Sequence, residues 1–183
     1  LKPWGLTDEN VTYVHCKSEE VLLKALFGIL AKIKPDIITG WNIDGFDIPY
    51  IYNRTIKVLN QDWANKLSPL GWCRASNTSF SGRDSIKIDV NGIQIVDYLE
   101  LYKKFELSPR ENYKLDTIAM LELGENKIEL DCPFKESYSD KNWDRHVRYN
   151  IQDTRLIDRL DEKLQFIRVA ATMALSAKCN FTD

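Results

Sequence analysis

The sequence is poor in the residues that bind soft metal ions. Its 183 residues include two histidines, His15 and His146, and four cysteines that are scattered along the chain without any C-x-x-C pair. Structural zinc sites need such residues at close spacing, so we expect no zinc site. The dispersed cysteines fit reduced thiols in an intracellular protein.

Long apolar runs and a strong charge imbalance are also missing. No segment is apolar enough over a sufficient length to span a membrane, and no signal peptide opens the sequence, so we expect no membrane partner. Hydrophobic residues make up 44% of the chain, charged residues 28%, and the formal net charge is −2. This composition fits one globular domain over residues 1–183. It provides no broad positive field for nucleic acid, so a polyanion would be held locally, by metal ions or a small basic patch.

The hydrophobic pattern predicts a mixture of strands and helices, which is typical of an α/β protein. Strands are expected at residues 11–16 and 37–39, and a hairpin of residues 86–90 and 93–96 around the turn Asn91-Gly92. Helices are expected from the cap Ser18 to residue 33, and at residues 47–59, 98–105, 115–123 and 143–174. Residues 61–84 lack periodicity, and we expect a long loop there.

The most informative stretch is residues 35–50, PDIITGWNIDGFDIPY. A short apolar strand ends before a turn, and Asp47 stands where a helix can begin. The pattern therefore places Asn42, Phe46 and Asp47 at the carboxyl end of a strand, where open α/β sheets carry their sites. The alternative is that Asp47 only caps a helix and that Phe46 belongs to the core.

A second candidate group lies in the sequence YNIQD, near the end of the chain. Tyr149 and Asp153 are four residues apart in a predicted helix, so a phenol and a carboxylate share one face. Singly, each has a simpler explanation, because Asp153 could be a solvated surface acid and Tyr149 could fill the core. Asp97, at the end of a predicted strand, is expected only to cap the following helix.

The segments PDIITGWNIDGFDIPYIYNR, LSPLG, DYLELYKKF and RYNIQD occur in this order along the chain. Together they resemble the 3′→5′ proofreading exonuclease domain of family B DNA polymerases, and within that family the replicative polymerases of large tailed phages. The resemblance covers roughly residues 11–183. It implies an RNase H-like α/β fold, with a mixed sheet flanked by helices and an inserted β-hairpin.

The resemblance also implies a role for each candidate residue. Asp47 is similar to the carboxylate of the second family motif, with Asn42 and Phe46 framing it at the substrate. Asp153 is similar to the last carboxylate, and Tyr149 to the tyrosine that orients the attacking water. The cofactors implied for the intact parent are two divalent ions, Mg²⁺ or Mn²⁺, about 4 Å apart. Such hard ions prefer oxygen ligands, which explains a site made of carboxylates.

One family motif is missing. The first motif, D-x-E on a strand, occurs nowhere in this sequence, and Glu129-Leu130-Asp131 has the reverse order and is expected at the surface. In the family the motif lies upstream of the residues present here. We therefore expect a fragment without the N-terminal strands and without the polymerase palm, which holds two of the four metal-binding carboxylates and is inactive by itself.

The function that the resemblance implies is the exonuclease part of a DNA-directed DNA polymerase, hydrolysing single-stranded DNA at a primer 3′ end in the cytoplasm of an infected bacterium. Its implied partners are the remainder of the polymerase chain and single-stranded DNA. The alternative is a non-catalytic fragment of the same fold that binds DNA or a partner chain. An RNA-processing exonuclease is a third possibility, which the GWNIDGFD and LYKKF segments disfavour. Self-association is also expected, because the strand at residues 37–39 would lack a neighbour on one side.

Overall fold

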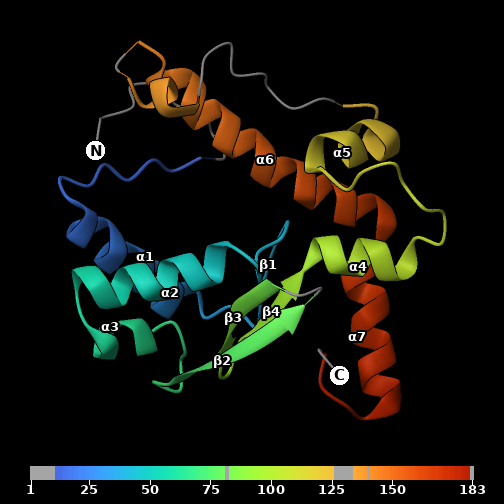
Figure 1. Cartoon of the computed structure of the whole chain (residues 1–183), viewed down its shortest axis with the longest axis horizontal. Helices are drawn as coiled ribbons and strands as arrows, with labels where there is room; N and C mark the ends of the chain where they lie inside the picture. Colours follow the sequence, from blue (N-terminus) through green and yellow to red (C-terminus); the bar gives the residue numbers. More distant parts are fainter. Residues whose placement is uncertain (1–10, 81–82, 126–133, 140, 182–183) are drawn as a thin grey trace. The chain divides into compact units, whose positions relative to one another are not determined.

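The computed structural model describes residues 11–80, 83–125, 134–139 and 141–181. The helices and strands are shown in Figure 1 and have the following bounds: α1 Glu19–Ile33, β1 Ile37–Gly40, α2 Asp47–Val58, α3 Gln61–Asn65, β2 Cys73–Phe80, β3 Arg83–Val90, β4 Gln94–Asp97, α4 Tyr98–Phe105, α5 Leu115–Leu123, the short 3₁₀ helix η1 Phe134–Tyr138, α6 Trp143–Leu164 and α7 Phe166–Ala177. The prediction of an α/β protein with helices beside its strands is confirmed, but the described strands form one parallel and one antiparallel two-stranded sheet and not the single mixed sheet that was expected. None of the helices in the described part of the chain is both long and apolar enough to cross a bilayer.

The chain groups into two compact units. One comprises residues 1–22 and 111–163, and the other residues 23–110 and 164–183. In the first unit, α5 and α6 are joined by an ion pair between Arg159 and Glu125, and Lys163 also contacts Glu122. That one domain spans residues 1–183 stays a prediction.

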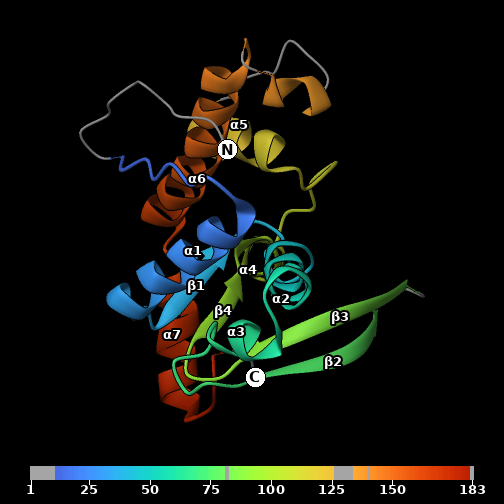
Figure 2. The ribbon, with the colours of Figure 1, turned by 90° about the vertical axis from the view of Figure 1, so that its left-hand side faces the viewer.

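The second unit contains a parallel pair of strands. β1 and β4 lie side by side and run in the same direction, as Figure 2 shows. Their register runs from Ile37 opposite Gln94 to Gly40 opposite Asp97. The hydroxyl of Thr39 donates to the carbonyl oxygen of Val96 at 2.7 Å and adds a side-chain bond to this ladder. Because the strands are parallel, their carboxyl ends meet at one edge of the sheet, which brings Gly40 and the residues after it close to Asp97.

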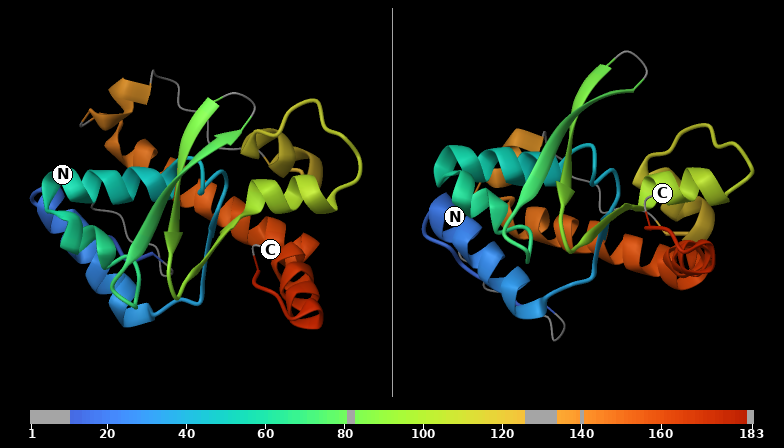
Figure 3. Two further views of the ribbon diagram at one scale, coloured as in Figure 1. Left: turned by 60° about the horizontal axis from the view of Figure 1, so that its bottom comes forward. Right: turned by 90° about the horizontal axis from the view of Figure 1, so that it is seen from below.

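The hairpin prediction is right in kind and wrong in position. β2 and β3 form the antiparallel hairpin, with Cys73 opposite Val90, and Figure 3 shows it as a long twisted ribbon. Asn91-Gly92 instead connects β3 to β4, which have different partners. β4 pairs with β1, where Ile95 and Val96 are nearly fully buried. The predicted loop at residues 61–84 is also wrong, since it contains α3 and β2.

Two further predictions are wrong. Residues 12–16 form no regular strand. The predicted helix of residues 143–174 is two helices, because Gln165 has a φ of 56° and breaks it between α6 and α7. The break lets Phe166 pack against the rings of α4, with ring centroids 6.2 Å from Tyr102 and 5.5 Å from Phe105. Other predicted helices are confirmed, including the cap at Ser18, whose hydroxyl accepts a hydrogen bond from the backbone of Val21.

The core of the second unit gathers residues from α1, α2, α3 and the strands. Leu23 and Phe27 are the buried residues of α1, and Phe27 packs against Trp63 with ring centroids 6.0 Å apart. These two residues are four apart and therefore share one helix face. Ile29 and Ile33 of the same helix are exposed and lie outside this core.

Two glycines give a matched test of this packing. Gly92 has a φ of +86°, and a Cβ there would lie 2.9 Å from Cγ of Pro69, whereas a Cβ on Gly28 in α1 would meet nothing within 4 Å. We expect Gly92→Ala to lower the free energy of unfolding by more than about 1 kcal/mol. Gly28→Ala should raise it by about 0.5–1 kcal/mol, because alanine is the better helix former. Urea unfolding followed by circular dichroism measures both, and equal effects would contradict this account of the turn.

Candidate functional site

The loop between β1 and α2 is a tight turn whose residue types follow from its geometry. Asn42 has a φ of 60°, in the left-handed region that asparagine tolerates better than most residues. Its carbonyl oxygen accepts a hydrogen bond from the backbone N–H of Phe46 at 3.1 Å. A Cβ on Gly45 would lie 2.6 Å from Oδ1 of Asn42, so a larger residue at this position would displace the Asn42 side chain. The turn therefore fixes the positions of Phe46 and the residue after it.

Asp97 holds this turn from the neighbouring strand. Its Oδ1 accepts hydrogen bonds from the backbone N–H groups of Asn42 and Leu99, both at 3.0 Å, and its Oδ2 accepts one from Asp44 at 3.3 Å. The side chain is 7% exposed. The prediction that Asp97 caps the following helix is confirmed by the bond from Leu99, but it is incomplete. Two of its three hydrogen bonds go to the loop that leads to Asp47.

Asp47 is the first residue of α2, and the simple capping explanation for it is wrong. The cap position belongs to Phe46, whose side chain makes no capping hydrogen bond. The carboxyl group of Asp47 stands at the positive end of α2, where desolvation raises its pKa and a hydrogen bond from its own backbone N–H acts to lower it. Its side chain is exposed.

Phe46 is likewise not a core residue. Its side chain is 63% exposed, and it stacks on Tyr50, which is 57% exposed. The two ring centroids are 6.0 Å apart, and the ring planes differ by 12°. An exposed pair of stacked rings beside a carboxylate suits a planar base better than it suits water. Sequence reasoning missed Tyr50 as a member of the site, although its four-residue spacing from Phe46 was the available signal.

The carboxyl groups of this region are electrostatically unfavourable to one another. Burial raises the pKa of Asp97, while its hydrogen bonds from backbone N–H groups lower it. Burial also raises the pKa of Asp44, with Lys87 acting against it and Asp97 adding to it. The pKa of Asp47 is raised by desolvation first and then by the charge of Asp97. A cation near these oxygens would relieve their repulsion, and oxygen donors favour a hard ion.

Tyr149 and Asp153 lie on α6, four residues apart and so on one helix face, as predicted. Both are half-buried. They belong to one compact unit, while Asn42, Phe46 and Asp47 belong to the other. The structure thus brings together the members of each group, and the convergence of the two groups stays a prediction.

In the described ranges, no three His, Cys, Asp or Glu residues are grouped so that they could hold a metal ion. Glu129-Leu130-Asp131 lies outside the described residues.

A hollow of about 420 Å³ adjoins this strand edge. Asp44, Asp97 and Glu100 line it together with Lys87, Lys103 and Lys104. Lys103 forms an ion pair with Glu100 at 2.7 Å. The lysines supply positive charge beside the acidic cluster, in a protein whose net charge is −2.

Comparisons with known proteins point to one family. Residues 5–118 match the family described as DNA polymerase family B, exonuclease domain. The DNA-directed DNA polymerase of Escherichia phage RB69 is 33% identical over 172 residues, covering 93% of this chain and 19% of the phage protein. That of Enterobacteria phage T4 is 31% identical over 176 residues, covering 95% of this chain and 19% of the relative. The DNA polymerase catalytic subunit of Murid herpesvirus 1 (strain Smith) is 32% identical over 171 residues. The chain therefore spans about a fifth of the length of the phage relatives.

The role of Asp97 can be tested by removing its hydrogen bonds. Asp97→Ala leaves three backbone N–H groups without their acceptor, and hydrogen bonds to a charged group contribute about 1.5–3 kcal/mol. We expect the free energy of unfolding to fall by about 2–3 kcal/mol, and amide hydrogen exchange at Asn42 and Asp44 to become faster. Asp97→Asn keeps one acceptor oxygen, so its free energy of unfolding should fall by less than that of Asp97→Ala. The matched control is Asp62→Ala on exposed α3, which should change stability by about 0.5 kcal/mol or less.

The pH dependence of these variants has a definite sign. Since burial raises the pKa of Asp97, the folded chain keeps this proton to a higher pH than the unfolded chain. The contribution of this group to the free energy of unfolding is therefore complete below the ordinary aspartate pKa of 3.8 and falls as the pH rises through the raised pKa. Asp97→Asn should lack this part of the pH dependence. A variant with the same pH profile as the parent chain would contradict the raised pKa.

Proposed function

Since this chain belongs to the exonuclease domain family of family B DNA polymerases, we propose that it forms part of a site that removes nucleotides from the 3′ end of single-stranded DNA. The observation that carries the proposal is the family match over residues 5–118, which includes the loop that sets Asn42, Phe46 and Asp47 at the strand ends. The parallel β1–β4 pair with flanking helices is compatible with the RNase H-like fold that the family implies. The substrate would be the primer end, and the chain would be part of a longer polymerase.

The proposed metal ligands are Asp47 and Asp153. Two Mg²⁺ or Mn²⁺ ions, when bound, would neutralise charge on the attacking and leaving oxygens of the phosphodiester. The donor set fits this group, because carboxylate oxygens suit hard ions and the raised pKa of Asp47 marks a place where a cation is favourable. Asp47 holds its carboxylate on the rigid first turn of α2.

The remaining residues would bind the DNA end and orient the attacking water. Tyr149 places its hydroxyl on the same helix face as Asp153, from where it can hydrogen-bond to the attacking water and fix its direction. Phe46 presents an exposed ring on which the terminal base can stack. Asn42 acts through the turn, because its left-handed backbone and its bond from Phe46 set where that ring lies.

A second function is favoured by the sequence itself. The D-x-E pair is absent from the 183 residues, so the chain holds two of the four carboxylates that the family uses. Under this second hypothesis, the chain is a non-catalytic fragment that binds DNA or a partner chain. Among the described residues β1 pairs only with β4, and self-association through its other side stays a prediction.

Metal binding tests whether the two candidate groups converge. We expect Mn²⁺ to broaden the backbone amide NMR signals around Asp47 and those around Asp153 at the same metal concentration, because carboxylates that share ions about 4 Å apart lie close together. Asp153→Asn should weaken the broadening at both places. Asp158→Asn, on the same helix, is the control and should leave both unchanged. Broadening confined to one of the two regions would refute the shared site.

Nuclease activity separates the two functions. Loss of two carboxylates removes several kcal/mol of transition-state stabilisation, and each 1.36 kcal/mol is about tenfold in rate. We therefore expect no measurable degradation of a labelled single-stranded oligonucleotide by this chain with Mg²⁺ or Mn²⁺. Robust 3′→5′ degradation that disappears in Asp153→Ala would show that other ligands replace the missing pair.

A further inference from the structure

A second hollow lies at the other end of the parallel strands. Asp36 and Ile93, which immediately precede β1 and β4, line it. The candidate active-site loop follows the carboxyl end of β1 instead, next to Asp97. The two places are thus separated by the length of the strands, and this hollow is not part of the site described above.

The hollow is a half-open groove of about 710 Å³. Its walls come from α1, α3 and the segment at residues 67–71, and its apolar lining includes Phe27, Leu30, Trp63, Leu67, Pro69 and Ile93. We call it the α1–α3 groove. Its volume lies within the range of about 300–1,000 Å³ that is usual for ligand pockets. It can therefore hold one or two large apolar side chains.

Gly28 leaves the wall of α1 open. It lines the groove, and a Cβ added to it would meet nothing within 4 Å. Glycine inside a helix costs about 1 kcal/mol relative to alanine. A larger residue here would improve the helix and fill apolar space, so the open wall is not what stability alone favours.

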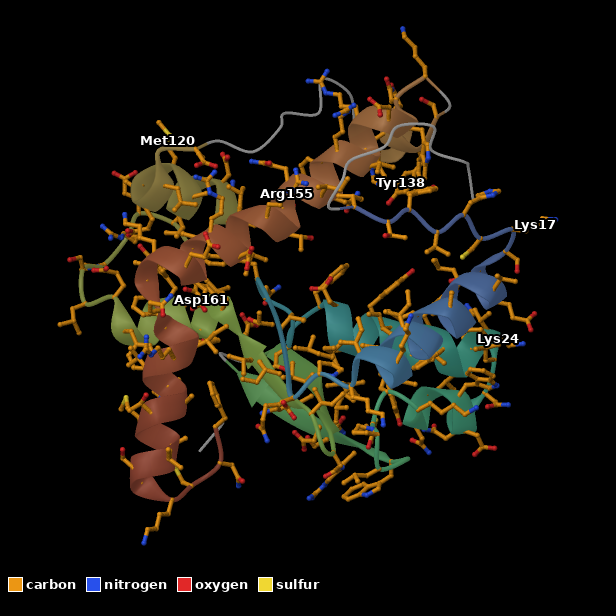
Figure 4. All side chains as sticks on the ribbon, turned by 180° about the vertical axis from the view of Figure 1, so that it is seen from behind. Lys17, Lys24, Met120, Tyr138, Arg155 and Asp161 are labelled. Carbon is orange, nitrogen blue, oxygen red and sulfur yellow. The ribbon has the colours of Figure 1, made fainter. Side chains whose placement is uncertain are left out.

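The rim of the groove is positively charged. Lys24, Lys34 and Lys66 line it, whereas Asp36 is the acidic residue among the lining side chains. The ammonium group of Lys66 lies 3.7 Å from the ring centroid of Trp63 and that of Lys24 lies 5.5 Å from it; Figure 4 labels Lys24 on α1. Within the described part of the chain, Lys34 and Lys66 form no ion pair with a carboxylate. This local excess of positive charge contrasts with the net charge of −2 for the whole chain.

We propose that the α1–α3 groove docks a segment of a partner protein that combines one or two large apolar side chains with neighbouring carboxylates. The apolar side chains would enter the space beside Gly28 and cover Phe27 and Leu30. The carboxylates would meet Lys34 and Lys66 at the rim, which is charge complementarity of the kind that selects partners. Nucleic acid is a poorer occupant, because a sugar-phosphate chain offers little to bury against an apolar lining.

Selection from a random library of 12-residue peptides displayed on phage tests this proposal on the full chain. We expect the enriched peptides to combine Leu, Phe or Trp with Asp or Glu. Synthetic, dye-labelled copies should bind with a Kd that fluorescence anisotropy can measure. Binding should be at least tenfold weaker to Gly28→Leu, which fills the groove, and to Lys66→Glu, which reverses a rim charge.

The matched control is Lys32→Glu, which makes the same charge change on α1 at a residue outside the lining, and which should bind as the parent chain does. Gly28→Leu should melt at the same temperature as the parent chain or higher, so that lost binding reports a filled groove and not unfolding. Failure to enrich any peptide, or equal binding by the parent chain and Gly28→Leu, would overturn the proposal. So would a dimer in analytical ultracentrifugation that Gly28→Leu abolishes, because the occupant would then be a second copy of this chain.

Discussion

The carboxylate of Asp97 is the constraint on which the candidate site depends. It lies at the end of β4, and it accepts hydrogen bonds from its own helix and from the loop after β1, 55 residues earlier in the chain. A buried carboxylate is costly unless it is hydrogen-bonded. Here the bonds that make its burial tolerable are the same bonds that fix the loop. The parallel register of β1 and β4 brings the two partners together.

The same arrangement explains why the site is electrostatically strained. Asp44, Asp47 and Asp97 all have a raised pKa, with desolvation as the first cause; the charge of Asp97 adds to it for Asp44 and Asp47, and that of Glu100 for Asp97. A fold under selection for stability alone would not gather carboxyl groups at one strand edge. Functional sites commonly carry such costs, because binding a cation or a substrate needs groups that the folded chain leaves incompletely satisfied.

The parallel strands have two chemically different ends. Their carboxyl end carries acids, exposed aromatic rings and the proposed catalytic Asp47. Their amino end carries the apolar, lysine-rimmed α1–α3 groove. The phage relatives are about five times longer than this chain, so the matching region is a part of a much longer polypeptide in those proteins. A surface for a protein partner at one end and a site for DNA at the other would fit such a context.

Much of the site was determined by the sequence itself. The loop N-I-D-G-F-D predicted a strand end, a tight turn and a helix start, because asparagine tolerates the left-handed backbone that the turn requires at Asn42. Local patterns likewise predicted α4 and α5 to the residue, since their ends depend on a cap or a left-handed glycine nearby. Only the tertiary structure decided what depends on distant partners. β4 pairs with β1, more than 50 residues earlier in the chain, and not with β3, and the last helix breaks at Gln165, where Phe166 packs on α4. Asp97 became the anchor of the loop because a parallel register placed it beside Asn42, which no local pattern encodes.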